Sequence, residues 1–139
     1  MTAENFIKSQ LALMAWREAH RYGGIDNMIA VAFVIRNRVK AGWHGGDWLD
    51  VMSNHYTFSA EAQAASAQEL PDVRETHFRV VLQKIDDLFA GMMVDKMTEE
   101  ALYYAELHNI TREWFTINIL RKPEEHPRIA QIGPVTFFR

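Results

Sequence analysis

Apolar side chains recur every three to four positions over residues 4 to 22, which predicts an amphipathic first helix. Gly23 and Gly24 come next, and glycine is suited to the left-handed cap that ends a helix. Residues 27 to 40, which Asp26 could cap, are apolar on almost every side, so their length and flanking caps favour a buried helix over a central strand. We expect the domain to fold around this second helix, which Gly42 ends.

The middle of the chain predicts further helices separated by glycine and proline. Gly45 and Gly46 precede a short helix that Asp47 could cap and that includes Trp48, Leu49, Val51 and Met52. From Ser59 an alanine-rich helical turn or two leads to Leu70 and Pro71. A longer helix is expected from residue 72 to residue 90, with Gly91 as its stop and an apolar stripe made of Phe78, Val81, Leu82, Ile85, Leu88 and Phe89.

The last third changes character, because residues 101 to 104 and 135 to 138 are short aromatic segments set between loop and proline signals. We interpret them as two short strands that could pair. Thr98, Glu99 and Glu100 could instead cap a helix that continues through Tyr104. The expected fold class is therefore α+β and mainly α, a single domain over residues 1–139 with a central buried helix and a small β-hairpin or short sheet.

Composition is that of an ordinary globular domain: 139 residues, 48% hydrophobic and 24% charged, with a formal charge of -3. The absence of cysteine excludes disulfides and thiolate chemistry. The scattered basic residues argue against nucleic acid as a partner. The longest apolar run, residues 28 to 35, is too short to span a bilayer, so we expect no membrane insertion. We also expect the protein to be a monomer.

Glu18 is the most informative single residue. At about 100° per residue, Ile7, Leu11, Met14 and Glu18 fall on one face of the first helix, which places a carboxylate among core-facing side chains. Burial and the negative end of the helix dipole both disfavour its charged form, as a general acid requires. The alternative is a structural glutamate that pairs with Arg17, Arg21 or Arg38 and ties two helices together.

Other chemistries find little support in the sequence. The six histidines match no metal-ligand spacing, and no serine-nucleophile motif or phosphate loop occurs, so we expect no metal and no cofactor. Aromatic residues are plentiful outside the helical stripes, and sugar-binding grooves use such rings because the apolar faces of pyranoses stack on them. These residues are Trp43, Trp48, Tyr56, Phe58, Tyr103, Tyr104 and Trp114.

Several motifs together resemble one family. Glu18-Ala19, a glycine-containing turn and residues 30 to 39 (AVAFVIRNRV) are similar to the E-A-R-G-E … A-V-A-x-V-I-x-N-R-V signature of cell wall hydrolases of the spore cortex-lytic (SleB-like) type. Downstream, residues 57 to 59 (TFS) resemble that family's Q-F-S element and residues 101 to 104 (ALYY) its G-A-L-Y-Y strand. Ile132-Gly133 with Phe137-Phe138-Arg139 resembles its closing I-G-x-H-x-F-Y segment. The resemblance covers the chain from about Leu11 to its end.

The resemblance implies a lysozyme-like fold and cleavage of the bond between N-acetylmuramic acid and N-acetylglucosamine in peptidoglycan. It assigns the catalytic acid to Glu18, and we expect the glycan strand to contact Phe58, Ser59, Tyr103, Tyr104 and Trp114. This chain departs from the family at three places. The second glutamate has no counterpart in the segment from His20 to Gly24, the glutamine before Phe58 is Thr57, and the late histidine is Thr136.

Glycoside cleavage usually needs two carboxylates, and only Glu18 stands out. A single acid suffices for a lytic transglycosylase, in which the muramic C6 hydroxyl is the nucleophile, and we prefer that reaction. In a hydrolytic muramidase, Asp26, Asp47, Asp50 or Glu61 would position water.

Two hypotheses from other functional classes remain open: a non-catalytic peptidoglycan-binding or virion structural protein, and a small helical interaction module unrelated to glycans.

No secretory signal is visible at the N-terminus. Action on the cell wall, as a phage lysis protein released by a holin or as a virion enzyme, is therefore the expectation.

Overall fold

The computed structural model describes residues 2–19, 24–58, 76–91, 95, 97–107, 110 and 113–139. The helical elements are α1 (Ala3–Ala19), α2 (Gly24–Lys40), a 3-10 turn η1 (Trp43–Gly46), α3 (Trp48–Phe58), α5 (Thr76–Phe89), α6 (Glu113–Phe115) and a π-helical turn η3 (Thr116–Leu120). The strands are β1 (Tyr103–Glu106), β2 (Arg128–Ile132) and β3 (Val135–Phe138). The predicted α+β class with mainly helical content is confirmed.

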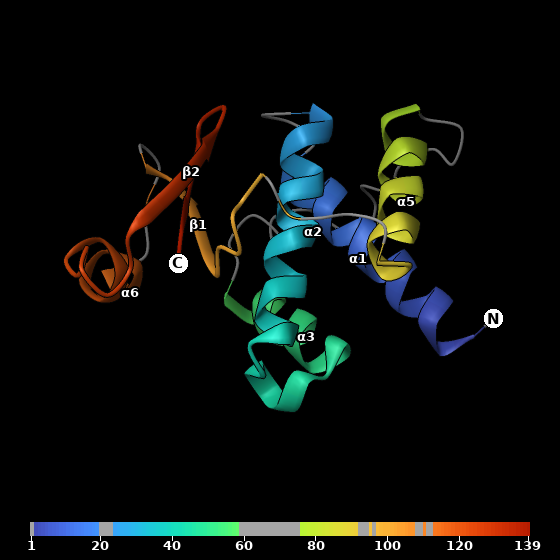
Figure 1. Cartoon of the computed structure of the whole chain (residues 1–139), viewed down its shortest axis with the longest axis horizontal. Coiled ribbons are helices and arrows are strands. Elements are labelled where there is room, and N and C mark those ends of the chain that lie inside the picture. Colours follow the sequence, from blue (N-terminus) through green and yellow to red (C-terminus); the bar gives the residue numbers. More distant parts are fainter. Residues whose placement is uncertain are drawn as a thin grey trace.

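Helix α2 lies in the middle of the molecule, with α1 and α5 on one side and the sheet on the other (Figure 1). Helix α3 lies against the C-terminal half of α2, and α6 lies beyond the sheet, at the end of the molecule away from α5. None of the helices in the described part of the chain is long and apolar enough to span a membrane.

Helix α2 is the buried helix that its sequence predicts. Its residues from Met28 to Ile35 are all buried, because other elements cover it on several sides. The helix begins at Gly24, three residues earlier than expected, and Gly24 has a φ of 62°, a left-handed conformation that glycine adopts without strain. Gly42, at a φ of 84°, follows the other end as predicted.

Helix α1 buries the stripe that its periodicity predicts. Leu11 and Met14 are completely buried, Glu18 is 4% exposed, and Ile7 packs at the margin of the same core. The helix is described to Ala19, so the expected extension to residue 22 lies outside the described residues.

Helix α3 begins as its sequence predicts, because the Asp47 side chain accepts a hydrogen bond of 2.9 Å from the backbone N–H of Asp50. Among its residues of described burial, Val51, Met52 and His55 are buried, at a spacing that places them on one face. The predicted alanine-rich turns after Ser59 lie outside the described residues.

Helix α5 packs against α1 and α2 through its apolar stripe. Phe78, Val81, Ile85 and Leu88 are buried, while Leu82 and Phe89 are partly buried at the edge of the same core. The helix is described from Thr76, and the expected start at residue 72 lies outside the described residues. Gly91 follows it with a φ of 73°, as a left-handed stop requires.

The two predicted strands pair with each other. Strands β1 and β3 are antiparallel, with Tyr103 opposite Phe138 and Tyr104 opposite Phe137. The alternative of a helix running through Tyr104 is therefore wrong. A third strand, β2, pairs with the other edge of β3, so the order is β1-β3-β2 and every residue of the central strand is buried.

Hydrogen bonds of Asn37 and Asp95 connect the loop before β1 to α2. The buried Asn37 amide donates to an Asp95 carboxylate oxygen at 3.1 Å and to the Ala101 carbonyl oxygen at 2.9 Å. Asp95 also accepts hydrogen bonds from the hydroxyl and backbone N–H of Thr98 and from the backbone N–H of Glu100. Burial alone would raise the pKa of Asp95, but these hydrogen bonds outweigh it and hold that pKa below its ordinary value.

Asp95→Asn is expected to destabilise the fold at neutral pH and to matter less in acid. A carboxyl whose pKa is depressed by folding stabilises the folded state above its unfolded-state pKa, and this contribution disappears as the pH falls through the folded-state value. The difference in urea-unfolding free energy between wild type and the variant should therefore shrink from about pH 7 to about pH 3. An equal difference at both pH values would contradict the role assigned to this carboxylate.

Candidate active site

Three polar side chains from three different elements meet beside α2. Glu18 comes from the C-terminal end of α1, His55 from α3 and Tyr104 from β1. His55 Nε2 lies 2.7 Å from Glu18 Oε1 and 3.1 Å from the Tyr104 hydroxyl oxygen. The Tyr104 hydroxyl is also hydrogen-bonded to Glu18 Oε2. We call Glu18, His55 and Tyr104 the acid cluster.

Glu18 is the only acidic side chain that is buried in the part of the chain that the structure describes. Its position follows from the stripe of α1, since the residues one and two turns before it are buried core residues. A buried carboxylate is stable only when its oxygens are hydrogen-bonded, and His55 and Tyr104 supply one partner to each oxygen. The core-facing position expected from the sequence is therefore confirmed.

Arg38 contacts the His55 ring nitrogen that does not face Glu18. Its Nη1 lies 3.0 Å from His55 Nδ1, and its Nε donates to the Leu102 carbonyl oxygen at 2.8 Å. Burial lowers the pKa of the Arg38 guanidinium, while attraction to Tyr104, Glu18 and Tyr103 opposes that effect. Of the arginines considered as partners of Glu18, Arg38 thus belongs to the site through His55, whereas Arg21 lies outside the described residues.

Sheet register places Tyr104 in the acid cluster. Tyr104 lies opposite Phe137, their ring centroids are 5.9 Å apart, and Phe137 is fully buried. Directly opposed residues in antiparallel strands share one face of the sheet, so the Tyr104 ring packs against the buried Phe137 ring. Thr136 is the neighbour of Phe137 along β3, so it belongs to the opposite face.

Tyr103 belongs to a group of partly exposed rings next to the acid cluster. Its ring centroid lies 5.5 Å from that of Trp43 in η1 and 5.1 Å from that of His126. The Arg38 guanidinium lies 4.9 Å from the Trp43 ring and 5.9 Å from the Tyr103 ring, within range of cation–π attraction. Trp43, Tyr103 and His126, here called the ring platform, are joined through Tyr103, and Arg38 lies beside the first two of them.

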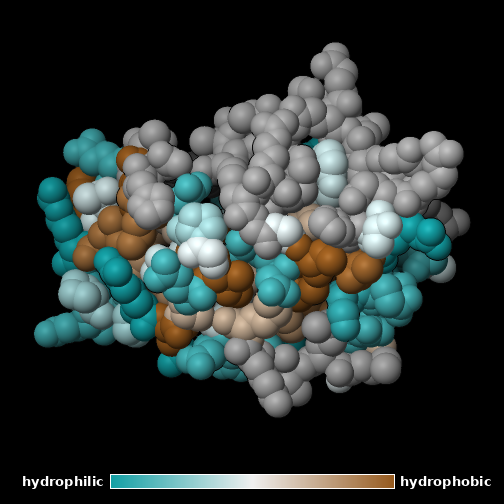
Figure 2. All heavy atoms as spheres, turned by 90° about the horizontal axis from the view of Figure 1, so that it is seen from above, coloured by the Kyte–Doolittle hydropathy of each residue, from teal (hydrophilic) through white to brown (hydrophobic). Residues whose placement is uncertain are grey.

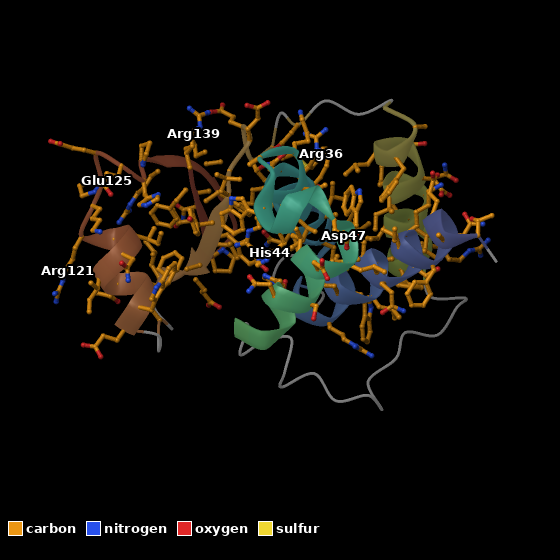
Figure 3. The ribbon with its side chains drawn as sticks, turned by 90° about the horizontal axis from the view of Figure 1, so that it is seen from below. Arg36, His44, Asp47, Arg121, Glu125 and Arg139 are labelled. Carbon is orange, nitrogen blue, oxygen red and sulfur yellow. The ribbon has the colours of Figure 1, made fainter. Side chains whose placement is uncertain are left out.

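Of the remaining expected contact residues, only Trp114 has a described side chain, and it does not lie at Glu18. Trp114 is 50% exposed on α6, which both ribbon views place on the other side of the sheet from α1 (Figures 1 and 3). Its neighbour Ile117 is 41% exposed. Seen from above, apolar and hydrophilic side chains are interspersed over the described part of the surface (Figure 2). Phe58 ends α3, but its side chain and the whole of Ser59 lie outside the described residues.

Three of the four carboxylates considered as a second catalytic group, Asp26, Asp47 and Asp50, do not join the acid cluster. Asp47 caps α3, and Figure 3 labels it at the start of that helix. Asp26 and Asp50 are exposed in the first turns of α2 and α3. Glu61 lies outside the described residues.

His55 is not singled out by the sequence motifs, and Arg38 is predicted from the sequence only as a structural partner of Glu18. A signal for His55 was present, because Val51, Met52 and His55 follow the same apolar spacing that singles out Glu18. Among the described residues, no group of three or more histidine or acidic side chains is arranged to hold a metal ion.

The comparisons of this chain with protein-family models, with curated proteins and with solved structures gave no match.

Proposed function

We propose that this protein is a peptidoglycan-degrading glycosidase that cleaves the β-1,4 bond between N-acetylmuramic acid and N-acetylglucosamine, with Glu18 as the catalytic residue. The observation that carries the proposal is a buried carboxylate with a hydrogen-bonding partner on each oxygen, next to partly exposed rings. An acid in a protected position can exchange a proton with a bound substrate. The family resemblance of the sequence supports the same assignment.

The preferred reaction is that of a lytic transglycosylase. Protonated Glu18 gives its proton to the bridging oxygen as the bond from the muramic C1 to that oxygen breaks. The Glu18 carboxylate then takes a proton from the muramic C6 hydroxyl, whose oxygen bonds to C1 and closes a 1,6-anhydro ring. Proton and electron pairs balance within one carboxyl group. The lack of a second carboxylate in the described acid cluster supports this reaction over hydrolysis.

The fold proposed for the chain is lysozyme-like. A mainly helical body that supplies the acid from the end of a helix, together with a small antiparallel sheet beside it, supports that assignment. The ring platform is the proposed contact surface for a glycan strand, because its rings offer apolar faces and Arg38 and His126 offer polar groups beside them. The proposed site of action is accordingly the cell wall.

Digestion of purified peptidoglycan with the wild-type protein tests the proposal. Mass spectrometry of the released muropeptides is expected to show 1,6-anhydromuramic ends, whereas a hydrolase would give products heavier by one water. Heavier products would keep the glycosidase and overturn the transglycosylase. If intact, folded protein released no soluble muropeptides, the glycosidase proposal would fail in favour of a binding or structural role.

A further inference from the structure

Four polar side chains form a chain that begins at Arg38 of α2, passes through His55 and the proposed catalytic Glu18, and ends at Tyr104 of β1. Arg38 Nη1 lies 3.0 Å from His55 Nδ1, and His55 Nε2 lies 2.7 Å from Glu18 Oε1. Glu18 Oε2, the other oxygen, is hydrogen-bonded to the Tyr104 hydroxyl. Each member therefore contacts the next through a defined atom, and His55 Nε2 also lies 3.1 Å from the Tyr104 hydroxyl oxygen. The donor and acceptor capacities of these atoms restrict where protons can lie.

The guanidinium fixes the direction of the first two hydrogen bonds. A guanidinium has only N–H donors, so His55 Nδ1 has to accept and carries no proton itself. A neutral imidazole has one N–H, which must then be at Nε2, and this group donates to Glu18 Oε1. A second proton on His55 would set two N–H groups 3.0 Å apart, next to the positive charge of Arg38.

Arg38 is held in place for this role by contacts independent of His55. Its Nε donates to the Leu102 carbonyl oxygen, and its guanidinium lies against the Trp43 ring on the other side. The neighbouring Asn37 binds the same segment through the Ala101 carbonyl oxygen. The side chain consequently reaches His55 with its geometry already set by α2 and by the start of β1.

We propose that Arg38 and His55 are positioning residues that confine the exchangeable proton of the site to Glu18 Oε2. His55 donates permanently to Oε1 and neither receives nor releases a proton during the reaction. In the acid state Oε2 carries the proton and donates it toward the Tyr104 oxygen. In the base state the Tyr104 hydroxyl donates to Oε2, so the hydrogen bond between these two oxygens reverses once in each half of the reaction. This inference rests on the proposed glycosidase function.

The arrangement prevents a loss of catalytic acid. An imidazole in contact with a carboxyl could take its proton and form a stable ion pair, and such a carboxylate could no longer protonate a glycosidic oxygen. With Arg38 at Nδ1, this transfer would create two adjacent positive charges, so the proton stays on the Glu18 and Tyr104 side.

The first test reads the His55 tautomer by 15N NMR of histidine-labelled protein near neutral pH, with the His55→Gln variant assigning the signals. In the wild type, Nδ1 is expected to be unprotonated and Nε2 protonated. In Arg38→Met, which keeps the length of the side chain without a donor, protonation of Nδ1 should appear. A wild-type His55 with a proton on Nδ1 would overturn the proposal, whether or not the protein cleaves peptidoglycan.

The second test compares His55→Gln with His55→Leu in muropeptide release. The glutamine amide can donate to Oε1 in place of Nε2 but cannot transfer a proton near neutral pH, so its activity should stay within about tenfold of the wild type. Leucine removes the donor, and activity is expected to fall by a further roughly 10- to 100-fold, the worth of one hydrogen bond to a charged group. Unfolding temperatures establish that both variants are folded.

If folded His55→Gln were as inactive as His55→Leu, His55 would transfer a proton itself and the proposal would be wrong. A wild-type protein that releases no muropeptides would defeat the proposed function, while the NMR test would still decide the arrangement of Arg38 and His55. A protonated Nδ1 in an active wild type would defeat this inference alone.

Discussion

Glu18→Gln is expected to abolish measurable muropeptide release while the fold is kept. The amide has the shape of the carboxyl group but can neither give a proton to the bridging oxygen nor take one from the C6 hydroxyl. General acid–base catalysis contributes roughly 10²- to 10⁴-fold to a rate, and here both steps depend on the same group. Release of soluble muropeptides from a peptidoglycan suspension, followed over time, measures the loss.

The matched control lies on the same helix. Glu4 is exposed and pairs only at the surface, with Lys8 at 3.2 Å, so Glu4→Gln should leave the release rate unchanged. Unfolding curves of both variants separate loss of chemistry from loss of structure. Activity in Glu18→Gln comparable to that of Glu4→Gln would remove Glu18 from the mechanism.

Phe137→Ala is expected to have the largest effect on stability. The side chain is fully buried in the central strand and packs with the core residues Ala30, Val34 and Ala101. Truncation of a buried phenylalanine to alanine costs about 3–5 kcal/mol, a large part of the stability of a domain of this size. Denaturant unfolding at equilibrium measures the change, and activity should fall as well because Tyr104 loses the ring beneath it.

Phe6→Ala provides the comparison. Phe6 is 45% exposed on α1, and truncation of a largely exposed side chain on a helix is expected to change the unfolding free energy by about 0.5 kcal/mol or less. Similar unfolding free energies for the two alanine variants would contradict the position of Phe137 at the centre of the sheet.

The helices were predictable because their sequence signals agree with their environment. Helix α2 combines an apolar run with glycines at both ends, and Asp47 caps α3 as its position suggests. Strand β2 was missed because only Ile129 and Ile132 among its five residues are β-branched, and it lies at an edge where alternation is weak. Its existence depends on pairing with β3, a contact between segments that local pattern does not describe.

The candidate site was predictable where a residue breaks a pattern or lies in a segment that carries the family resemblance. Glu18 interrupts an apolar stripe and so stands out, and the partly exposed Tyr103 and Tyr104 follow from the resemblance of their segment. His55 interrupts the stripe of α3 in the same way, but a histidine is tolerated in a core more easily than a carboxylate and attracts less notice. The contact of Arg38 with His55 joins α2 to α3 and required the tertiary structure.

The acid cluster is divided between two parts of the molecule. Glu18 and His55 belong to the helices, whereas Tyr104 arrives with an edge strand that Asn37 and Arg38 of α2 hold through the Ala101 and Leu102 carbonyl oxygens. The acid cluster therefore forms only while the sheet remains packed on α2. Partial opening along this boundary would switch the site off with every helix still intact, so loss of activity on heating is expected to precede loss of helical signal.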